Sequence, residues 1–345
     1  MRLHKFSDVD AFVALDLDGA ETASGPVRWA RKVLQGGAKD LARSQTYTYA
    51  VLRMRRSGAS AGISSDASAR AEAVTGFVAE AAALASGGVY LPDAAKGVTE
   101  DDLASLRDAD PRTAARLGGF ASECDALSAV AAADAAVGID GRSVVLEGFS
   151  AAGPTLVEAV TRRGGRVVGV ATAEGSLATP EGCDPAAVSE AWAASGKRTL
   201  ESLAEACVSD GLDEPDALWG IAADVVFAGS RMGVVDHGVA ERLQCLALVP
   251  SGRLAYTAKA LAVCRKRDIV AVPDFVSLAG STIAAWSSTD ISDDEVRAAV
   301  AETVSSLMSE ALDSADGAFL GACCAAEAFL STWRDELPFG RPLAS

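Results

Sequence analysis

A glycine-rich turn between two apolar segments is the stretch of this sequence best suited to chemistry. Residues 143–147 (SVVLE) have the length and β-branched content of a buried strand, residues 148–153 (GFSAAG) form the turn, and Pro154 suits the start of a helix. A second apolar run follows at residues 167–170. This layout holds the pyrophosphate of a dinucleotide, because the backbone of the turn approaches the phosphates closely. Ser150 stands where the middle glycine is expected, so the fingerprint is incomplete, and a purely structural turn is the alternative.

The strands that must position this turn recur along the rest of the chain. Helical stretches separate short apolar runs at residues 144–146, 167–170, 224–228, 246–249 and 269–273. Strands with interleaved helices predict an α/β fold with a Rossmann-type, doubly wound parallel sheet. Residues 292–295 (SDDE) then form a capping box that opens a helix to about residue 313, and a second helix covers about residues 316–333.

The first part of the chain is expected to mix strands and helices. An early strand covers residues 11–16, residues 27–54 are mostly helical with an interruption at residues 36–37, and residues 57–63 (SGASAGI) form a loop of small residues. A helix over about residues 66–85 precedes a short strand at residues 89–93. Residues 99–102 (TEDD) resemble a capping box that opens another helix.

Composition limits the classes of function open to this 345-residue chain. The formal net charge of −16 argues against nucleic-acid binding, which needs a basic face, and against binding to anionic membranes. No apolar run approaches the length of a membrane span and no signal peptide is recognisable, so we expect a cytoplasmic protein. The seven cysteines form no CxxC pair and are expected to be buried, reduced thiols, and two histidines argue against a metal site.

Six blocks, in the right order, resemble the Glu/Leu/Phe/Val (amino-acid) dehydrogenase family. Residues 41–48 (LARSQTYT) are similar to its LARxMTxK block, residues 57–63 to its GGAKGGI or GGGK loop, and residues 91–99 (LPDAAKGVT) to its APDVGT segment. Residues 147–153 (EGFSAAG) match QGFGNVG, and residues 167–185 match a stretch of the type VVAVSDSDGAVYNPDGLD. Residues 269–282 (IVAVPDFVSLAGST) are similar to ILVIPDFLANAGGV.

The resemblance implies a two-domain enzyme that carries out the reversible oxidative deamination of an amino acid to a 2-oxo acid. The implied cofactor is NAD or NADP, and the implied assembly is an oligomer, which we expect to be a homo-oligomer. We place a substrate and oligomerisation domain at residues 1–130, a Rossmann dinucleotide-binding domain at residues 131–288, and C-terminal helices that fold back at residues 289–345.

The implied catalytic site departs from the family pattern. Thr48 stands where the family has a lysine that binds the substrate carboxylate, and Ser60 where it has the lysine whose lowered pKa supports proton transfer. A hydroxyl carries no charge and cannot do this electrostatic work. Asp93 is retained from the family as the candidate catalytic carboxylate, although it could equally be a loop residue.

The implied binding residues are altered as well. The acidic residue that should hold the adenine ribose aligns with Thr172, and Glu174 lies two positions on. Arg253 and Leu278 align with two family asparagines along the cleft, and a guanidinium at Arg253 could clamp a substrate carboxylate or a cofactor phosphate, or form a surface ion pair. The candidate cofactor-binding residues are Gly148, Phe149, Ser150, Ala151, Gly153, Thr172 and Glu174.

From these observations we expect an NAD(P)-dependent oxidoreductase that acts on an amino acid or a related oxo or imino compound. Because both lysines are missing, it should be poor at ordinary glutamate or leucine deamination. The alternative is a catalytically silent paralogue that binds a nucleotide or a small metabolite, or that serves as a partner subunit in a mixed oligomer.

Overall fold

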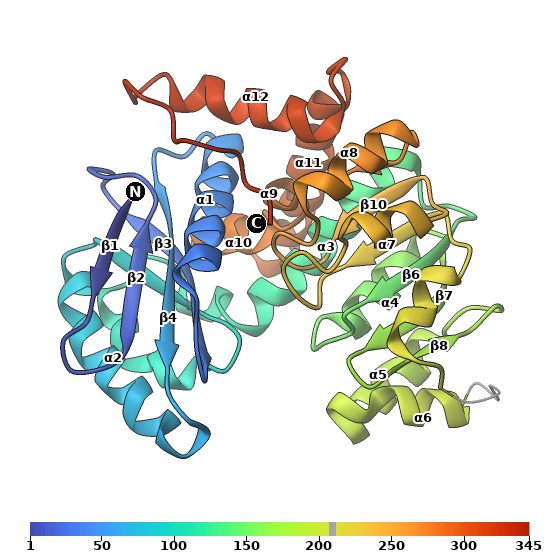
Figure 1. The fold of residues 1–345 in the computed structure, drawn as a ribbon, viewed down its shortest axis with the longest axis horizontal. Coiled ribbons are helices and arrows are strands. Elements are labelled where there is room, and N and C mark those ends of the chain that lie inside the picture. The colour runs from blue at the N-terminus through green and yellow to red at the C-terminus, as the bar shows by residue number, and fades with distance from the viewer. Residues whose placement is uncertain (207–211, 345) are drawn as a thin grey trace.

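Two sheets with helices around them form the computed structural model, which describes residues 1–206 and 212–344 (Figure 1). The first sheet has the strand order β1-β2-β4-β3-β5, in which β1 and β2 pair antiparallel, β2 and β4 pair antiparallel, and β3 pairs parallel with β4 and β5. Its strands are β1 (Arg2–Lys5), β2 (Ala11–Leu15), β3 (Ala23–Ala30), β4 (Ser57–Ser64) and β5 (Tyr90–Ala94).

The loop expected at residues 57–63 is instead β4, a central and buried strand of the first sheet, so that prediction is wrong. Its small residues allow α1 (Gln35–Val51) to pack directly on the strand: a Cβ at Gly58 would lie 2.0 Å from the carbonyl oxygen of Ala42. On the opposite face, Ala59, Ala61 and Ile63 share a core with Phe77 of α2 (Arg70–Ser86). The sequence lacks the bulky β-branched residues typical of strands, because the close packing of α1 requires small side chains on this strand.

The helix expected over residues 27–54 is also wrong in its first part. Residues up to Ala30 belong to β3, which hydrogen-bonds to strands on both sides, and the pairing partners lie far along the chain. Gly36 and Gly37 do not interrupt a helix but lie in the first turn of α1. The strand predicted at residues 11–16 and the one at residues 89–93 correspond to β2 and β5.

The second sheet confirms the predicted α/β fold and carries the glycine-rich turn. Its order is β11-β10-β9-β6-β7-β8, and all neighbouring pairs are parallel except the unpredicted β7–β8 hairpin. The strand order reverses between β6 and β9, and in such sheets ligands bind at the carboxyl ends of the strands on either side of that point. The strands are β6 (Ser143–Glu147), β7 (Arg166–Thr172), β8 (Gly175–Ala178), β9 (Val225–Ala228), β10 (Ala247–Pro250) and β11 (Val270–Ala271).

Helices connect and cover these strands, and α4 (Gly153–Arg162) is the predicted crossover between β6 and β7. The remaining α-helices are α3 (Gly119–Val137), α5 (Pro185–Ser195), α6 (Thr199–Ala206), α7 (His237–Arg242), α8 (Ala258–Lys266), α9 (Asp274–Ser277), α10 (Gly280–Trp286), α11 (Asp293–Leu312) and α12 (Ala318–Leu330). The 3-10 helices are Ala67–Ala69, Asp101–Ala109, Ala114–Arg116, Gly196–Arg198 and Pro215–Gly220.

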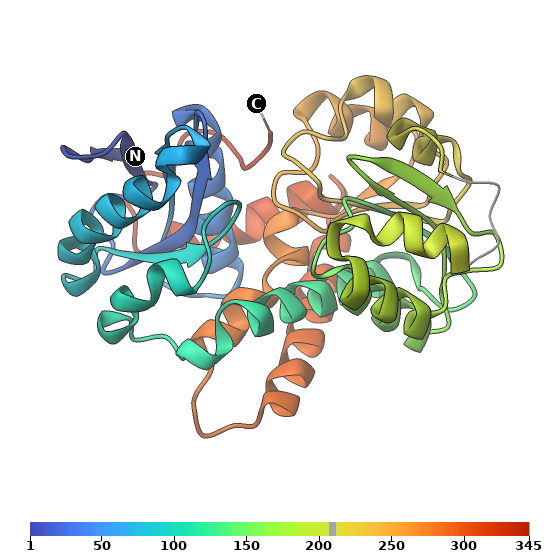
Figure 2. The ribbon, with the colours of Figure 1, turned by 90° about the horizontal axis from the view of Figure 1, so that it is seen from below.

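The chain end folds back as expected, because α12 packs on α1 and the capping box of Ser292 and Glu295 opens α11. The box at residues 99–102 opens a 3-10 helix rather than an α-helix. Helices α3, α9 and α10 lie between the two sheets, and α3 runs across both halves of the molecule (Figure 2). The proposed domain boundary at residue 130 falls within α3, and the three-part division remains a prediction.

Two further properties concern the chain as a whole. Among the residues that the structure describes, no helix has the length and hydropathy needed to cross a membrane. Cysteine burial is mixed, because Cys124, Cys183, Cys264 and Cys323 are buried whereas Cys324 is exposed. Cys207 lies outside the described residues.

Candidate active site

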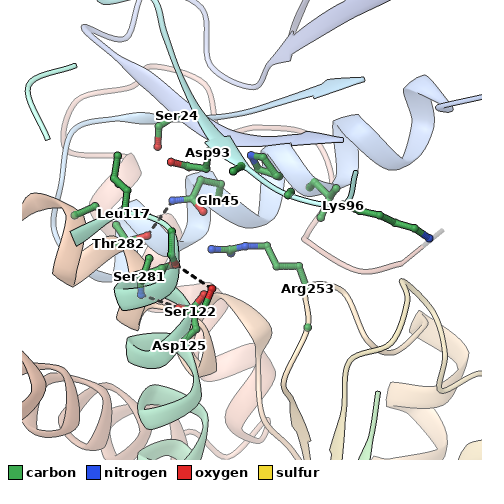
Figure 3. Close-up of a pocket in the computed structure, with 18 of the residues that line it drawn as sticks. Ser24, Gln45, Asp93, Lys96, Leu117, Ser122, Asp125, Arg253, Ser281 and Thr282 are labelled. Carbon is green, nitrogen blue, oxygen red and sulfur yellow. Dashed lines mark hydrogen bonds between the residues drawn. The ribbon is translucent and has the colours of Figure 1, made fainter. Parts of the chain in front are cut away.

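A cavity of about 820 Å³ opens between the two sheets and gathers several of the predicted site residues. Asp93 at the end of β5, Ser150 in the glycine-rich turn and Arg253 in the loop after β10 all line it. Side chains from α1, α3 and α10 complete the wall, so the cavity is built from both halves of the chain. Figure 3 shows Gln45, Arg253 and Asp125 reaching into this space from three different elements.

Asp93 is held in a network of buried charges. Its Oδ1 lies 2.5 Å from Nη1 of Arg112, whose Nη2 lies 2.7 Å from Oδ2 of Asp110. Burial disfavours the charged form of Arg112, but the neighbouring carboxylates of Asp93 and Asp110 outweigh this cost and raise its pKa. Arg107 also contacts Asp110, at 3.1 Å. This ion-pair network fixes the position of Asp93 at the edge of the cavity.

Thr48 does not face the cavity directly, because its side chain is fully buried in α1. Its hydroxyl donates to the carbonyl of Ser44 at 3.2 Å and accepts from Nη1 of Arg253, also at 3.2 Å. Arg253 reaches further to the Ser44 hydroxyl and the Leu278 carbonyl, each at 3.4 Å. The guanidinium therefore lies next to the residue that the resemblance matches to a carboxylate-binding lysine.

Ser60 and Leu278 are both buried and contribute no side chain to the lining of the cavity. The Ser60 hydroxyl donates to the carbonyl of Pro26 at 3.3 Å, across the β4–β3 pairing. The Leu278 side chain packs inward, and only its backbone carbonyl contacts Arg253. Their predicted roles at the site remain predictions, and the structure offers a structural use for each.

Asp125 is a second carboxyl group in the cavity, on α3. Burial raises its pKa to about 6, although the charge of Arg253 and a hydrogen bond from the backbone N–H of Ser281, at 2.7 Å, partly offset this rise. A carboxyl group with a pKa near neutrality can both accept and donate a proton under physiological conditions. Asp125 is thus a second candidate for proton transfer in this cavity.

The glycine-rich turn has the geometry that its sequence predicts. Gly148 adopts a φ of +89°, and a Cβ there would lie 2.3 Å from the backbone nitrogen of Ser230, so a larger residue is excluded. Phe149 is buried against Trp192, whereas Ser150 and Ala151 are exposed at the mouth of the turn. Gly153 begins α4. Exposed backbone ahead of a helix start is suited to a phosphate group.

A second groove, of about 740 Å³, lies at the carboxyl ends of β6 and β7. Thr172 lines it, whereas Glu174 is exposed at the hairpin and does not. Lys96, Ser230 and Arg231 line both this groove and the large cavity, so the two spaces adjoin. Together they offer room for an extended ligand such as a dinucleotide. In Figure 3 the Lys96 side chain extends away from Arg253 and Asp125.

Sequence reasoning missed several residues of the cavity: Arg28, Gln45, Tyr49, Arg112 and Asp125. Arg112 and Asp125 belong to none of the motifs that the sequence analysis singles out, and Asp125 lies on α3. Gln45 belongs to the block at residues 41–48, which could have indicated it, and donates to the hydroxyl of Thr282 at 3.1 Å. Across residues 1–206 and 212–344, no cluster of acidic, cysteine or histidine side chains could hold a metal ion.

Comparison with known proteins assigns the chain to a family. Residues 122–325 match the model of the Glutamate/Leucine/Phenylalanine/Valine dehydrogenase family. The chain belongs to this family. A family relative, glutamate dehydrogenase A2 of Halobacterium salinarum, is 28% identical over 148 residues, which are 43% of this chain and 34% of that protein. The chain thus matches about a third of the length of this relative.

Solved structures of glutamate dehydrogenases have the same fold. The hetero-hexameric glutamate dehydrogenase of Thermus thermophilus, in a leucine-bound form, has a TM-score of 0.76 at 23% identity, covering 92% of this chain and 82% of that chain. The glutamate dehydrogenase of Plasmodium falciparum has a TM-score of 0.78 at 13% identity, covering 94% of this chain and 79% of that chain. At these identities the likeness establishes the two-domain dehydrogenase fold with its Rossmann-type sheet.

Proposed function

We propose that this protein is an NAD(P)-dependent oxidoreductase that acts on an amino acid or on a related oxo or imino compound. The observation that carries the proposal is the single cavity in which Ser150 of the glycine-rich turn, Arg253 and the carboxyl groups of Asp93 and Asp125 meet. Family membership supports a dehydrogenase-like reaction. A nicotinamide cofactor, when bound, would accept or supply the hydride.

The residues present fit such a cofactor. The tight turn at Gly148 leaves Ser150 and Ala151 exposed beside the start of α4, where a pyrophosphate would be held. The groove past Thr172 continues from this turn and would hold the adenosine part. Thr172 offers a hydroxyl in place of the usual carboxylate, so whether NAD or NADP binds is an outcome of the experiment below.

The chain's own side chains would handle the substrate. Arg253 would bind its carboxylate, because a guanidinium offers paired donors that match a carboxylate. Asp93 or Asp125 would exchange a proton with its amino or carbonyl group, and Asp125 has the pKa for that task at neutral pH. With hydroxyls at positions 48 and 60, we expect slow turnover of glutamate and leucine.

A catalytically silent paralogue is the second candidate. It is favoured by the burial of Thr48 and Ser60, since neither side chain is available for chemistry. Such a protein would bind a nucleotide or metabolite, or act as a partner subunit. One solved neighbour is a hetero-hexamer, so a mixed oligomer is a reasonable form for this chain as well as the homo-oligomer we propose.

We also propose a cytoplasmic location.

Calorimetric titration with NAD, NADH, NADP and NADPH separates the two candidates. Binding of one pair, followed by turnover in a panel of amino acids and 2-oxo acids, is the expected result. Binding without turnover of any compound in the panel would favour the silent paralogue. If no dinucleotide binds, the oxidoreductase proposal is wrong.

A further inference from the structure

Asp274 is a buried carboxyl group that lies behind the wall of the large cavity and does not line it. It begins α9, and the residue is only 3% exposed. Its Oδ2 accepts a hydrogen bond from the Ser44 hydroxyl at 2.7 Å and another from the backbone N–H of Leu254 at 3.0 Å. Burial raises the pKa of Asp274, and these hydrogen bonds and the charge of Arg253 partly offset the rise. One oxygen atom thus joins α1 to the loop after β10.

The hydroxyl groups of Ser44 and Thr48 donate away from Arg253. The proton of the Ser44 hydroxyl goes to Asp274, and the proton of the Thr48 hydroxyl goes to the Ser44 carbonyl at 3.2 Å. Because a hydroxyl has one proton and two lone pairs, each oxygen is left as an acceptor. Both oxygens accept from Nη1 of Arg253, at 3.4 Å and 3.2 Å. Asp274 therefore ensures that Arg253 meets a lone pair, and not a proton, at Ser44.

The second hydrogen bond to Asp274 holds the backbone next to Arg253. Leu254 is buried and adopts a φ of +55°, a conformation that is costly for any residue except glycine. Such a conformation persists only where its surroundings hold it. The Leu254 N–H donates to Asp274, and the Leu254 side chain packs with Leu41 and Ala344. The same carboxylate oxygen thus fixes both the loop and, through Ser44, the guanidinium that the loop carries.

These contacts use only part of the guanidinium of Arg253. Of its five N–H donors, Nη1 directs two to Ser44 and Thr48, and Nη2 directs one to the Leu278 carbonyl at 3.4 Å. Among the described residues, the other Nη2 proton and the Nε proton have no acceptor, and the side chain extends into the cavity (Figure 3). A pair of N–H groups on one guanidinium matches the two oxygens of a carboxylate. Contacts on the Nη1 side therefore leave two donors free for a ligand.

We propose that Asp274 is the positioning residue of Arg253: its Oδ2 orients the Ser44 hydroxyl and holds the Leu254 backbone, so that the guanidinium presents its free donors to the cavity. The inference rests on the proposed function, in which Arg253 binds the carboxylate of the substrate. Asp274 touches neither substrate nor cofactor in this arrangement and acts through its two neighbours. Its removal should therefore affect ligand binding only while Arg253 is present.

The test is calorimetric titration of the full-length protein with 2-oxobutyrate, a probe with one carboxylate. Ser44→Ala removes the oxygen between Asp274 and Arg253, and Asp274→Ala removes the acceptor itself. We expect each variant to bind the probe roughly tenfold more weakly, which is the loss expected for a hydrogen bond to a charged group. In an Arg253→Gln background, neither should weaken binding further. Dinucleotide affinity should stay unchanged throughout.

The matched control is Ser277→Ala, a second buried serine on α9. Its hydroxyl donates to the Pro250 carbonyl at 2.8 Å and does not contact Arg253, so its loss should leave probe affinity unchanged. Asp274→Asn keeps one acceptor oxygen and should recover part of the affinity that Asp274→Ala loses. Circular dichroism melts check that each variant folds, and Ser44→Ala alone tests the proposal if Asp274→Ala does not fold.

Crystal structures of the wild type and of Ser44→Ala give a readout that needs no ligand. In the variant, the Arg253 guanidinium should move by about 1 Å or more from the Thr48 hydroxyl, a displacement large enough to impair binding. An unmoved guanidinium overturns the proposal, and so does a loss of probe affinity that adds to that of Arg253→Gln, because Asp274 would then act on the fold alone. If the wild type does not bind 2-oxobutyrate, the crystal structures decide. Failure of the proposed function is distinguishable, since it appears as a lack of dinucleotide binding.

Discussion

Two parts of the cavity wall, around Arg112 and around Arg253, carry their charges in different ways. Arg112 forms ion pairs with Asp93 and Asp110, and these pairs hold its part of the wall together. On the side of the second sheet, Arg253 contacts only hydroxyls and a carbonyl, and Asp125 accepts its short hydrogen bond from a neutral N–H group. Paired charges hold the wall of the cavity, whereas unpaired ones remain available to a ligand. Removing each kind should therefore have a different consequence.

Removing the ion pairs of Arg112 should have the largest effect on stability. Arg112→Gln leaves the buried carboxylate of Asp110 with Arg107 as its remaining partner. We expect a loss of about 3–5 kcal/mol in the free energy of unfolding, because a buried charge is left largely uncompensated. Urea denaturation measures this loss, with Arg55→Gln as the control. A loss below about 1 kcal/mol would contradict the structural role of the pair.

Adding a charge to the unpaired side should have a somewhat smaller effect. Thr48→Lys places an ammonium group beside Arg253 in a buried site. We expect the free energy of unfolding to fall by about 2–4 kcal/mol. The double variant Thr48→Lys, Arg253→Asn has the residue types that the family resemblance gives at both places. It should recover most of the lost stability in the same denaturation assay. No recovery would mean that the two positions do not share one cationic site.

The pH dependence of Asp125 sharpens the comparison further. Its pKa is raised from the ordinary 3.8 to about 6, so between these pH values the folded carboxyl group keeps a proton that the unfolded chain has lost. Stability should therefore fall as the pH rises through this window, and Asp125→Asn should remove that fall. Between pH 4 and pH 7, the free energy of unfolding of the variant should rise by up to about 3 kcal/mol relative to that of the wild type.

Denaturation at several pH values checks this difference, and a constant difference across the window would contradict it. In an active enzyme, the limb of the pH–rate profile near pH 6 should also disappear in Asp125→Asn. Asp93→Asn is the matched comparison, because it removes the charge of the other carboxyl group in the cavity. If only Asp93→Asn changes the profile, Asp125 is not the group that transfers the proton.

The smallest effect is expected at Ser60. Its one hydrogen bond, 3.3 Å long, joins it to the Pro26 carbonyl, and its side chain does not reach the cavity. Ser60→Ala should cost no more than about 1 kcal/mol and leave ligand affinity unchanged. A tenfold loss of dinucleotide or 2-oxo-acid affinity in this variant would show that Ser60 contributes to ligand binding.

The turn at residues 148–153 shows what local sequence can predict. A short apolar strand, a glycine that must adopt positive φ and a proline at a helix start are all local signals, and the β6–α4–β7 unit forms where they indicate. The strand at residues 57–64 shows the limit. Its small residues resemble a loop, and only the close approach of α1 explains them.

The candidate site divides along the same line. Recognisable blocks of sequence predicted Asp93 and the turn at Gly148, and the alignment with a family asparagine predicted Arg253. Arg28, Arg112 and Asp125 carry no such pattern. Arg28 reaches the cavity because β3 lies beside β4 in the first sheet. Arg112 reaches it because the segment after β5 folds back against Pro92 and Asp93. Asp125 reaches it because α3 crosses between the sheets.

By itself, then, the sequence determined the family, the Rossmann-type sheet and the absence of a charge at positions 48 and 60. Only the tertiary structure decided that Arg253 lies beside the Thr48 hydroxyl, and that burial raises the pKa of Asp125 to about 6. The physical reason is that charge pairing and desolvation depend on distances between segments far apart in the chain. Such distances leave no pattern along one sequence.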